Sequence, residues 1–425
     1  MSKKWLLFLG LMLIGMVALA SCAGPVGPQG EIGPAGPAGP IGPQGPKGDT
    51  GPAGSAAEAG ANAAEFVGDS ICSGCHKDLY DTYMQSGHPW KLTKVVDGQA
   101  PAFPFTTIDE LPAGYTWDDI LYVIGGYQWK ARFINKEGFI ITDEPGKTGN
   151  AEYLNQYNFA NETIGHEAGW VTYNSGKENL PYTCGECHTT GYSPNGNQDG
   201  LPGLVGTWAQ DGIRCEACHG PGSLHMSNPP GYAMKIERDS ELCGQCHRRG
   251  EVENVDAKDG FIEHHEQYEE LFQGKHNALK CVDCHDPHTG VNQLRQAGEK
   301  STRTMCENCH FQQAKFMKGP HKDLGLSCIE CHMTRIVKSA WGNADTFTGD
   351  IRTHLMAIDP TQIDQFVTVK EGDTEKTYAI SQIGLNYACR HCHIQGKGFP
   401  KTDEELINLA TGFHDRPASS EATTP

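Results

Sequence analysis

The clearest alternation of apolar and polar residues lies in the first half of the chain. Residues 127–134 and 139–142 each read as a strand, and a Gly-containing turn at residues 135–138 separates them. This pattern predicts a β-hairpin. A second strand region is expected at residues 365–369 and 376–380.

Helical patterns are short. Apolar spacing predicts helices at residues 261–273 and 404–410. From residue 184 to residue 328 pairs of cysteines begin every 22 to 38 residues, too closely for ordinary domains, which is typical of short helices and loops wrapped around a non-protein core.

Cysteines explain that core. The chain has 17 cysteines, and sixteen of them fall into eight copies of Cys-x-x-Cys-His. Numbered in chain order, motifs 1 to 8 are Cys72/Cys75/His76, Cys184/Cys187/His188, Cys215/Cys218/His219, Cys243/Cys246/His247, Cys281/Cys284/His285, Cys306/Cys309/His310, Cys328/Cys331/His332 and Cys389/Cys392/His393.

Each motif predicts one covalently bound haem c. The two thiols form thioethers with the two vinyl groups of one haem, and the adjacent His is the proximal ligand of the iron. A redox dithiol or half of a zinc site also uses Cys-x-x-Cys, but neither explains a His after the second Cys in all eight copies. We therefore expect eight haems.

The composition agrees with a haem core. Only 38% of the residues are hydrophobic and the mean hydropathy is −0.48, which is low for a chain with large aliphatic cores. Porphyrins would supply the missing apolar surface. The expected fold is a mostly α and irregular, haem-cored multihaem cytochrome with a small β-hairpin region, preceded by a collagen-like stalk.

The N-terminus predicts export and lipidation. Lys3 and Lys4 precede a short apolar stretch, so residues 1–21 are interpreted as a signal peptide. The sequence Leu-Ala-Ser-Cys ending at Cys22 resembles a bacterial lipobox, in which Cys22 is lipidated. The alternative is an ordinary cleavage site next to an unmodified Cys. Ala23, where a retention signal often has Asp, favours the outer membrane or cell surface over a periplasm-facing anchor.

A glycine repeat follows. Every third residue from 24 to 54 is Gly, and Pro is abundant. Glycine at period three with proline is the signature of the collagen triple helix. The repeat thus predicts a stalk and a homotrimer formed through it, and a single-stranded polyproline-type spacer is the alternative. The domain plan is a signal peptide at 1–21, lipidated Cys and stalk at 22–54, a junction at 55–65, an octahaem domain at 66–414 and a tail at 415–425.

Nineteen histidines are more than the eight motifs use. The eleven others are candidates for the sixth position of each iron. From their local context we expect distal ligands at His88, His166, His225, His265, His276, His288, His321 and His354. His264 lies next to His265 on a predicted helix, where neighbouring side chains diverge by about 100°. His264, His391 and His414 are left as spares.

Two imidazoles on every iron would leave no position for a substrate. An iron in this state transfers electrons, so no catalytic residue is expected. The chain also lacks a Cys-x-x-Cys-Lys motif, which disfavours an ammonia-forming nitrite reductase site.

Residues 215–225, CEACHGPGSLH, resemble a recurring block of multihaem cytochromes related to cytochrome c-554, in which the last His is a haem ligand. Residues 281–288 and 328–333 are similar to blocks of the wider superfamily, which includes hydroxylamine oxidoreductase and octahaem tetrathionate reductase. The resemblance spans about residues 68–395 and implies close-packed haems in one continuous chain. It supports His225 as a ligand and leaves carrier and enzyme both open.

The formal net charge of −18 disfavours nucleic acid as a partner. We expect an electron-transfer lipoprotein at the cell envelope that exchanges electrons with redox partner proteins or extracellular acceptors. One alternative is an oxidoreductase that acts on a small nitrogen or sulfur compound at one open haem. Another is a structural adhesin or spacer, which leaves eight haems unexplained.

Overall fold

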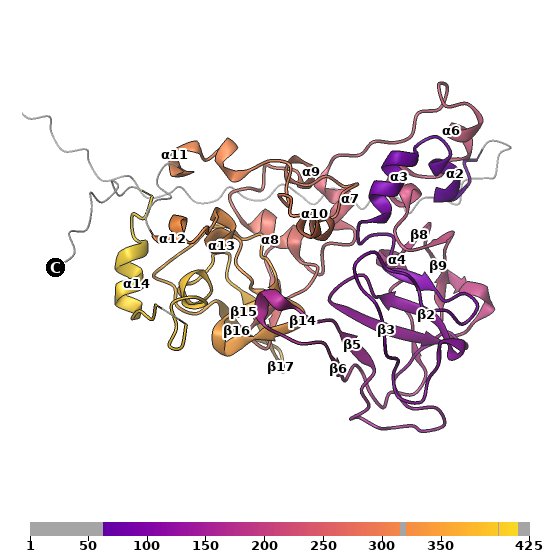
Figure 1. The fold of residues 1–425 in the computed structure, drawn as a ribbon, viewed down its shortest axis with the longest axis horizontal. Coiled ribbons are helices and arrows are strands. Elements are labelled where there is room, and N and C mark those ends of the chain that lie inside the picture. The colour runs from indigo at the N-terminus through magenta and orange to yellow at the C-terminus, as the bar shows by residue number, and fades with distance from the viewer. Residues whose placement is uncertain (1–62, 315–319, 398, 415–425) are drawn as a thin grey trace, which may run out of the picture. The chain divides into compact units, whose positions relative to one another are not determined.

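A computed structural model describes residues 63–314, 320–397 and 399–414 (Figure 1). The predicted signal peptide, lipidated Cys22, collagen-like stalk, most of the junction, and the tail lie outside these residues. No helix in the described part of the chain is both long enough and apolar enough to span a bilayer.

The chain between motifs 1 and 2 forms a seven-stranded sheet. Strands β1, β2, β3, β4 and β7 follow one another in it, and β5 joins β3 to β6. All its pairings are antiparallel. The strands are β1 (Leu92–Lys94), β2 (Ile120–Gly125), β3 (Lys130–Asn135), β4 (Phe139–Ile140), β5 (Gln156–Asn158), β6 (Gly169–Val171) and β7 (Leu180–Pro181).

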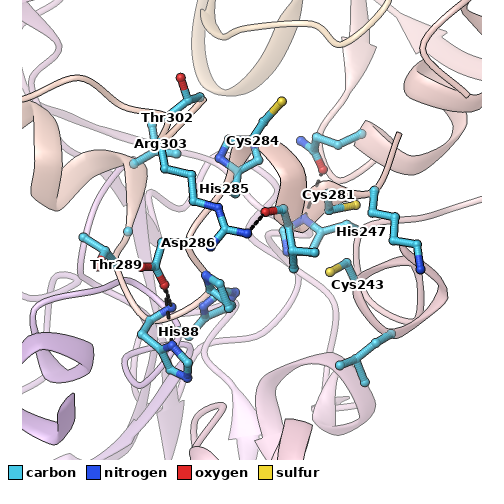
Figure 2. A pocket seen from close by; sticks show the side chains of 18 of the residues that line it. His88, Cys243, His247, Cys281, Cys284, His285, Asp286, Thr289, Thr302 and Arg303 are labelled. Atoms are coloured by element: carbon cyan, nitrogen blue, oxygen red, sulfur yellow. Dashed lines mark hydrogen bonds and ion pairs between the residues drawn. The ribbon is translucent and has the colours of Figure 1, made fainter. Parts of the chain in front are cut away.

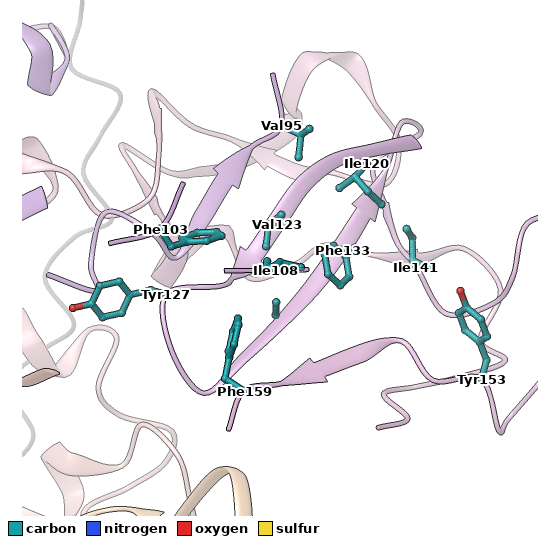
Figure 3. Packing of buried hydrophobic residues seen from close by; sticks show 11 residues of the cluster. Val95, Phe103, Ile108, Ile120, Val123, Tyr127, Phe133, Ile141, Tyr153 and Phe159 are labelled. Carbon is teal, nitrogen blue, oxygen red and sulfur yellow. The ribbon is translucent and has the colours of Figure 1, made fainter. Parts of the chain in front are cut away.

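The predicted hairpin is confirmed as β3 and β4. Ile134 pairs with Ile140, and Gly138 closes the turn with a φ of 88°, which L side chains rarely adopt. Around it, Ile120, Val123 and Phe133 are fully buried in a cluster of side chains from several strands and loops (Figure 3). This region therefore has an ordinary apolar core that needs no cofactor.

A second sheet has six strands in the order β15-β14-β13-β12-β17-β16. Its strands are β12 (Val255–Lys258), β13 (Phe261–Glu263), β14 (Val337–Asn343), β15 (Thr348–Ile351), β16 (Phe366–Glu371) and β17 (Thr374–Ala379). Strands β13 and β14 are parallel and the other pairs antiparallel. The strand region expected at 365–380 is confirmed as β16 and β17.

The helix predicted for residues 261–273 is wrong in its first half. Phe261 and Ile262 are buried in β13, which pairs with both β12 and β14, and only α8 (Gln267–Gln273) is helical. A left-handed turn at Asp259 and Gly260 leads into the strand. Pairing with distant strands overrides the local helical spacing here.

The remaining helices are short. They are α2 (Asp69–Ser73), α3 (Lys77–Met84), α4 (Gly185–His188), α5 (Cys215–His219), α6 (Ser223–Ser227), α7 (Ser240–Gly244), α9 (Cys281–Cys284), α10 (Val291–Gln296), α11 (Phe311–Ala314), α12 (Pro320–Asp323), α13 (Cys328–His332) and α14 (Asp403–Ala410). Single turns occur at Trp117–Asp119, Glu162–Ile164, Gln198–Gly200, Cys306–Asn308, Ala344–Thr346 and Asn386–Arg390. The helix expected at 404–410 is confirmed as α14.

Two small strand pairs complete the fold, β8 (Thr189–Thr190) with β11 (Gln210–Asp211) and β9 (Ser193–Asn197) with β10 (Val205–Thr207). The expectation of short helices and irregular chain is confirmed around the motifs. The expectation of only a small β-hairpin region is wrong, because the hairpin is part of a seven-stranded sheet and the chain has a second sheet of six strands.

Candidate haem-binding site

One continuous cavity of about 2920 Å³ runs through the motif region. Pockets for small molecules have about 300 to 1,000 Å³, so this space exceeds one ordinary ligand site. Cysteines and histidines of motifs 1 to 7 line it, and those of motif 8 do not. Figure 2 shows part of the wall, where motifs 4 and 5 meet near His88.

Each motif folds as about one helical turn. The His N–H donates to the carbonyl of the first Cys in motifs 1, 4, 5, 6 and 8, at 2.8 to 3.0 Å. Residues at i, i+3 and i+4 share one face of a helix, so both thiols and the imidazole point the same way. This geometry fits one porphyrin bound by its vinyl carbons and its iron.

Several motif histidines have Nδ1 engaged by a backbone carbonyl. The acceptors are Lys235 for His219 at 2.7 Å, Met356 for His332 at 2.8 Å and Phe399 for His393 at 2.8 Å. A proton on Nδ1 leaves Nε2 as the lone-pair nitrogen for a metal. The chemistry of these side chains therefore fits haem iron.

Most motif imidazoles face a second imidazole. A nitrogen ligand lies about 2 Å from a bound metal and its ring centre about 1 Å further, so two rings on one iron have centres roughly 6 Å apart. Seven motif histidines have such a neighbour, at centre distances of 5.8 to 6.5 Å. The pairs are His76–His225, His219–His288, His247 with either His88 or His265, His285–His354, His310–His276, His393–His321 and His332–His414.

The expected distal set and the observed neighbours differ at two positions. His166 stacks on Trp341 at 5.0 Å and lies beside no motif histidine of the described residues. His414, left as a spare, lies 5.8 Å from His332. The structure thus brings seven of the eight expected distal histidines next to a motif histidine and adds His414.

Motif 2 is different. Within the described ranges no second histidine ring is in contact with His188, although His264 and His265 contact each other at 4.3 Å. Burial and the positive charges of Lys91, Arg249, Arg132 and Lys130 lower the pKa of His188 to about 3.

These four cations form the cation cluster. Burial and the same four charges lower the pKa of His264. In the part of the chain that the structure describes, none of the four makes an ion pair with a carboxylate. Burial lowers the pKa of Lys130 to about 7. Lys91 and Arg249 line the motif cavity, whereas Lys130 and Arg132 do not, and sequence patterns gave no sign of the cluster.

Two buried carboxyl groups lie on and just before α8. Burial raises the pKa of Glu266 to about 9 and that of Glu270 to about 8. Glu270 accepts hydrogen bonds from Thr353 and from the backbone of His354, which ties α8 to the segment that carries the neighbour of His285.

Contacts between thiols of different motifs give the order of the motifs in space. The thiols of Cys72 and Cys215, of Cys187 and Cys246, and of Cys243 and Cys281 lie close enough to shift each other's pKa. Motifs 1 and 3, 2 and 4, and 4 and 5 are therefore direct neighbours. Helix α2 also contacts α5, and α7 contacts α9.

Weaker electrostatic effects between thiols identify further pairs of neighbouring motifs. Cys218 raises the pKa of Cys246, Cys328 that of Cys306, and Cys331 that of Cys389. Cys309 does the same to Cys284. The motifs follow one another as 1-3-4-5-6-7-8, and motif 2 branches from motif 4.

Two family models match parts of the chain. The model described as "Cytochrome c554 and c-prime" matches residues 155–220, and the one described as "Doubled CXXCH motif" matches residues 275–315. The resemblance to the cytochrome c-554 block found in the sequence lies at the end of the first match.

A curated relative is the multihaem cytochrome MtrA of Shewanella baltica (strain OS185), 23% identical over 133 residues, which are 28% of this chain and 35% of that protein. The chain thus matches about a third of the relative's length. A similar solved structure is the octahaem sulfite reductase MccA of Wolinella succinogenes, with a TM-score of 0.56, 18% identity, and coverage of 82% of this chain and 71% of that chain. The outer cell wall cytochrome OcwA gives a TM-score of 0.47, 19% identity, and coverage of 81% and 86%.

The motifs, their geometry and the matched families agree. They make the chain similar to multihaem c-type cytochromes, with the matched models at residues 155–220 and 275–315.

Proposed function

We propose that the chain relays electrons along eight haems in the order 1-3-4-5-6-7-8, with the haem of motif 2 as a side branch. The close thiol pairs of motifs 1 and 3 and of motifs 4 and 5, and the weaker electrostatic effects between the thiols of the other successive motifs, support this order. Haems bound to neighbouring motifs would lie close to one another, and a series without a gap is what electron transfer through one molecule requires.

In this proposal the sixteen motif cysteines form the thioethers and each motif histidine is the proximal ligand. The distal ligands are the facing imidazoles, at a spacing that suits one iron between two rings. His88 is assigned to motif 4, and His414 takes the place first given to His166. Irons held from both sides exchange electrons without binding substrate.

The setting of the relay rests on the sequence. A signal peptide, lipidated Cys22 and a collagen-like stalk would hold the haem domain at the outer membrane or cell surface, as a homotrimer if the stalk associates. Partners would be redox proteins or extracellular electron acceptors.

Pulse reduction tests the relay. A few electrons injected per thousand protein molecules should spread over the haems of one molecule at a rate independent of protein concentration. If the spread accelerates in proportion to concentration, electrons move between molecules and the relay is contradicted.

We also propose a second candidate, chemistry on a small nitrogen or sulfur oxyanion at the haem of motif 2. The specific observation is the environment of His188, whose pKa is lowered by burial and by the cation cluster and which, among the described residues, contacts no second imidazole. MccA is named an octahaem sulfite reductase; this name describes MccA alone, and sulfite belongs to the same class of substrate.

Spectroscopy separates the two candidates. The second predicts one high-spin ferric haem per molecule and a one-to-one change of the Soret band when nitrite is added. A fully low-spin protein whose spectrum nitrite leaves unchanged would exclude it and leave the relay intact.

A further inference from the structure

Glu216, the second residue of motif 3, is a buried acid with 2% of its surface exposed. It is the buried residue of α5. Its carboxylate accepts three backbone N–H groups, from Val67 at 2.9 Å, Gly68 at 2.9 Å and Gly222 at 2.8 Å. Hydrogen bonds to an ionised acceptor are the stronger kind. One side chain of motif 3 thus joins the start of the described chain to the segment that follows motif 3.

Both joined segments lead to residues that would hold the haem of motif 1. Gly68 is the N-cap of α2, which contains Cys72. Gly222 is the N-cap of α6, which contains His225. The ring of His225 faces that of His76, the motif 1 histidine, with centres 6.5 Å apart and planes 18° apart. A carboxylate in motif 3 therefore links the two sides of the haem site of motif 1.

Helices α2 and α6 have little else to hold them. Each has five residues, and none of these residues is buried. Helices of this length are not stable alone in water. Besides the carboxylate, Ser223 Oγ accepts from the Glu65 N–H at 2.8 Å, and the Ser223 N–H donates to the Glu65 carbonyl at 3.1 Å. His225 Nδ1 contacts the carbonyl of Tyr232, which lies in the exposed loop after α6. The place of His225 therefore depends on hydrogen bonds at the start of α6.

Gly222 allows Glu216 and α6 to approach closely. A Cβ added at Gly222 would lie 3.2 Å from Glu216 Oε1 and 3.2 Å from Val67 Cγ2. The φ of Gly222 is −95°, which any residue adopts, so an Ala there would act by pressing on these two atoms and not by backbone strain.

We propose that Glu216 is a positioning residue for the haem of motif 1: from within motif 3, its carboxylate holds the start of α6 and thereby keeps the His225 imidazole in place as the distal ligand. The proposal rests on the assignment of His225 to motif 1 in the proposed relay. It adds that one motif carries a residue on which the ligation of another motif depends.

The effect of losing the carboxylate should fall on α6. Helix α2 keeps a second link to motif 3, because Asp69 pairs with Arg214, the residue before motif 3, at 3.0 Å. Within the described ranges no ion pair includes a residue of α6. Without Glu216, the His225 side of the haem site should therefore loosen first.

The test measures how fast carbon monoxide displaces the distal imidazole from the ferrous haems of the full haem-loaded protein. Carbon monoxide binds only after the imidazole has left, so at saturating carbon monoxide the rate equals that of imidazole dissociation. His225→Ala identifies the phase that belongs to motif 1, because this haem should then bind carbon monoxide without a displacement step. If His225→Ala leaves every phase unchanged, the assignment of His225 is wrong and the proposal falls with it.

The decisive variant is Glu216→Gln, which replaces one acceptor oxygen by an NH₂ group that cannot accept. It should accelerate the motif 1 phase by about tenfold or more, since it removes a hydrogen bond to a charged group. The phases of the other haems should change by less than about twofold, as expected for distant sites. No acceleration at motif 1, or the same acceleration at every haem, would overturn the proposal.

Asp143→Asn is the matched control. Asp143 is also a buried carboxylate, 8% exposed, and accepts backbone N–H groups from Gly149 at 3.0 Å and Asn150 at 2.9 Å. It does not line the motif cavity. The motif 1 phase should stay within about twofold of the wild-type rate in this variant. Equal acceleration by both substitutions would show only a general loss of stability and would contradict the positioning role.

Gly222→Ala tests the same link with the charge of Glu216 retained, and it decides the question if Glu216→Gln does not fold. It should accelerate the motif 1 phase by about threefold or more, because a methyl group added to a close contact displaces its neighbours. Gly169→Ala on β6 is its control, since a Cβ there would have an ordinary contact at 3.7 Å. An unchanged motif 1 phase in Gly222→Ala would overturn the proposal.

The measurement reports the ligation of single haems and not electron transfer between them. If pulse reduction contradicts the relay while Glu216→Gln and Gly222→Ala accelerate the motif 1 phase, the relay fails and the positioning role stands. If the relay holds and neither variant changes that phase, the positioning role fails alone.

Discussion

The first sheet and the motif region achieve compactness by different means. The sheet of β1–β7 encloses side chains such as Ile120 and Phe133 that are fully buried. In contrast, between Leu271 and Ile336, which spans motifs 5 to 7, no hydrophobic side chain of the described residues is buried. A porphyrin that fills this space has the role that aliphatic side chains have in the sheet. One chain thus contains a protein core and a cofactor core, and the two should respond differently to perturbation.

Withholding haem should have the largest effect. In protein produced without haem attachment, amides of residues 272–335 are expected to exchange at least about a thousandfold faster than in the loaded protein, because the short helices there have no other core. Amides of β2 and β3 are expected to stay protected. Hydrogen exchange with mass spectrometry measures both segments in one sample. An equal loss of amide protection in both segments would contradict the division into a protein core and a cofactor core.

Phe133→Ala should have the next largest effect, and this effect should lie in the first sheet and not in the motif region. It removes a fully buried ring from the sheet core and should lower the free energy of unfolding of this region by about 3–5 kcal/mol. The haem spectrum should not change, since Phe133 does not line the cavity. Denaturant unfolding measures the loss of free energy of unfolding, and the visible spectrum shows whether the haem environment has changed.

Val367→Ala is the control for this change. Val367 lies on β16 with 46% of its surface exposed, so its loss should alter stability by less than about 0.5 kcal/mol. If Phe133→Ala instead removed haem absorbance, the sheet core would not be independent of the haems.

Apart from the control substitution, Thr402→Ala should have the smallest effect. Thr402 caps α14 by accepting from the Glu405 N–H at 3.3 Å, and the Glu405 carboxylate accepts from the Thr402 N–H at 2.7 Å. Loss of such a cap costs about 1 kcal/mol. The helix has its own cap, so exchange should increase in residues 403–410 alone. An effect that spreads to motif 8 would show that α14 depends on the haem core.

Sequence patterns predicted the parts of the fold that local rules determine. The β3–β4 hairpin and α14 follow from alternation, turn chemistry and apolar spacing. Residues 261–263 were assigned to a helix because their pairing with β12 and β14 depends on residues elsewhere in the chain. The seven-stranded sheet was underestimated because several of its strands have only two or three residues.

Prediction of the candidate site from sequence was limited in the same way, to what local patterns determine. Cys-x-x-Cys-His is a local pattern, and all eight copies were found from sequence. The imidazole that faces each motif can come from anywhere in the chain, as with His332 and His414, so ranking by local context preferred His166 over His414. The cation cluster could not be predicted, because its members come from β3, from the residue before β1 and from the loop after motif 4.

The most direct test of the relay removes one haem at a time from protein attached to an electrode through its N-terminal side. Without motif 5 (Cys281→Ala with Cys284→Ala), motifs 6 to 8 should lose fast reduction, and motifs 1 to 4 should keep it. Without motif 2 (Cys184→Ala with Cys187→Ala), all seven remaining haems should still be reduced rapidly, because motif 2 is a branch. If both variants lose the same fraction of fast-reduced haem, the motifs do not form the proposed chain.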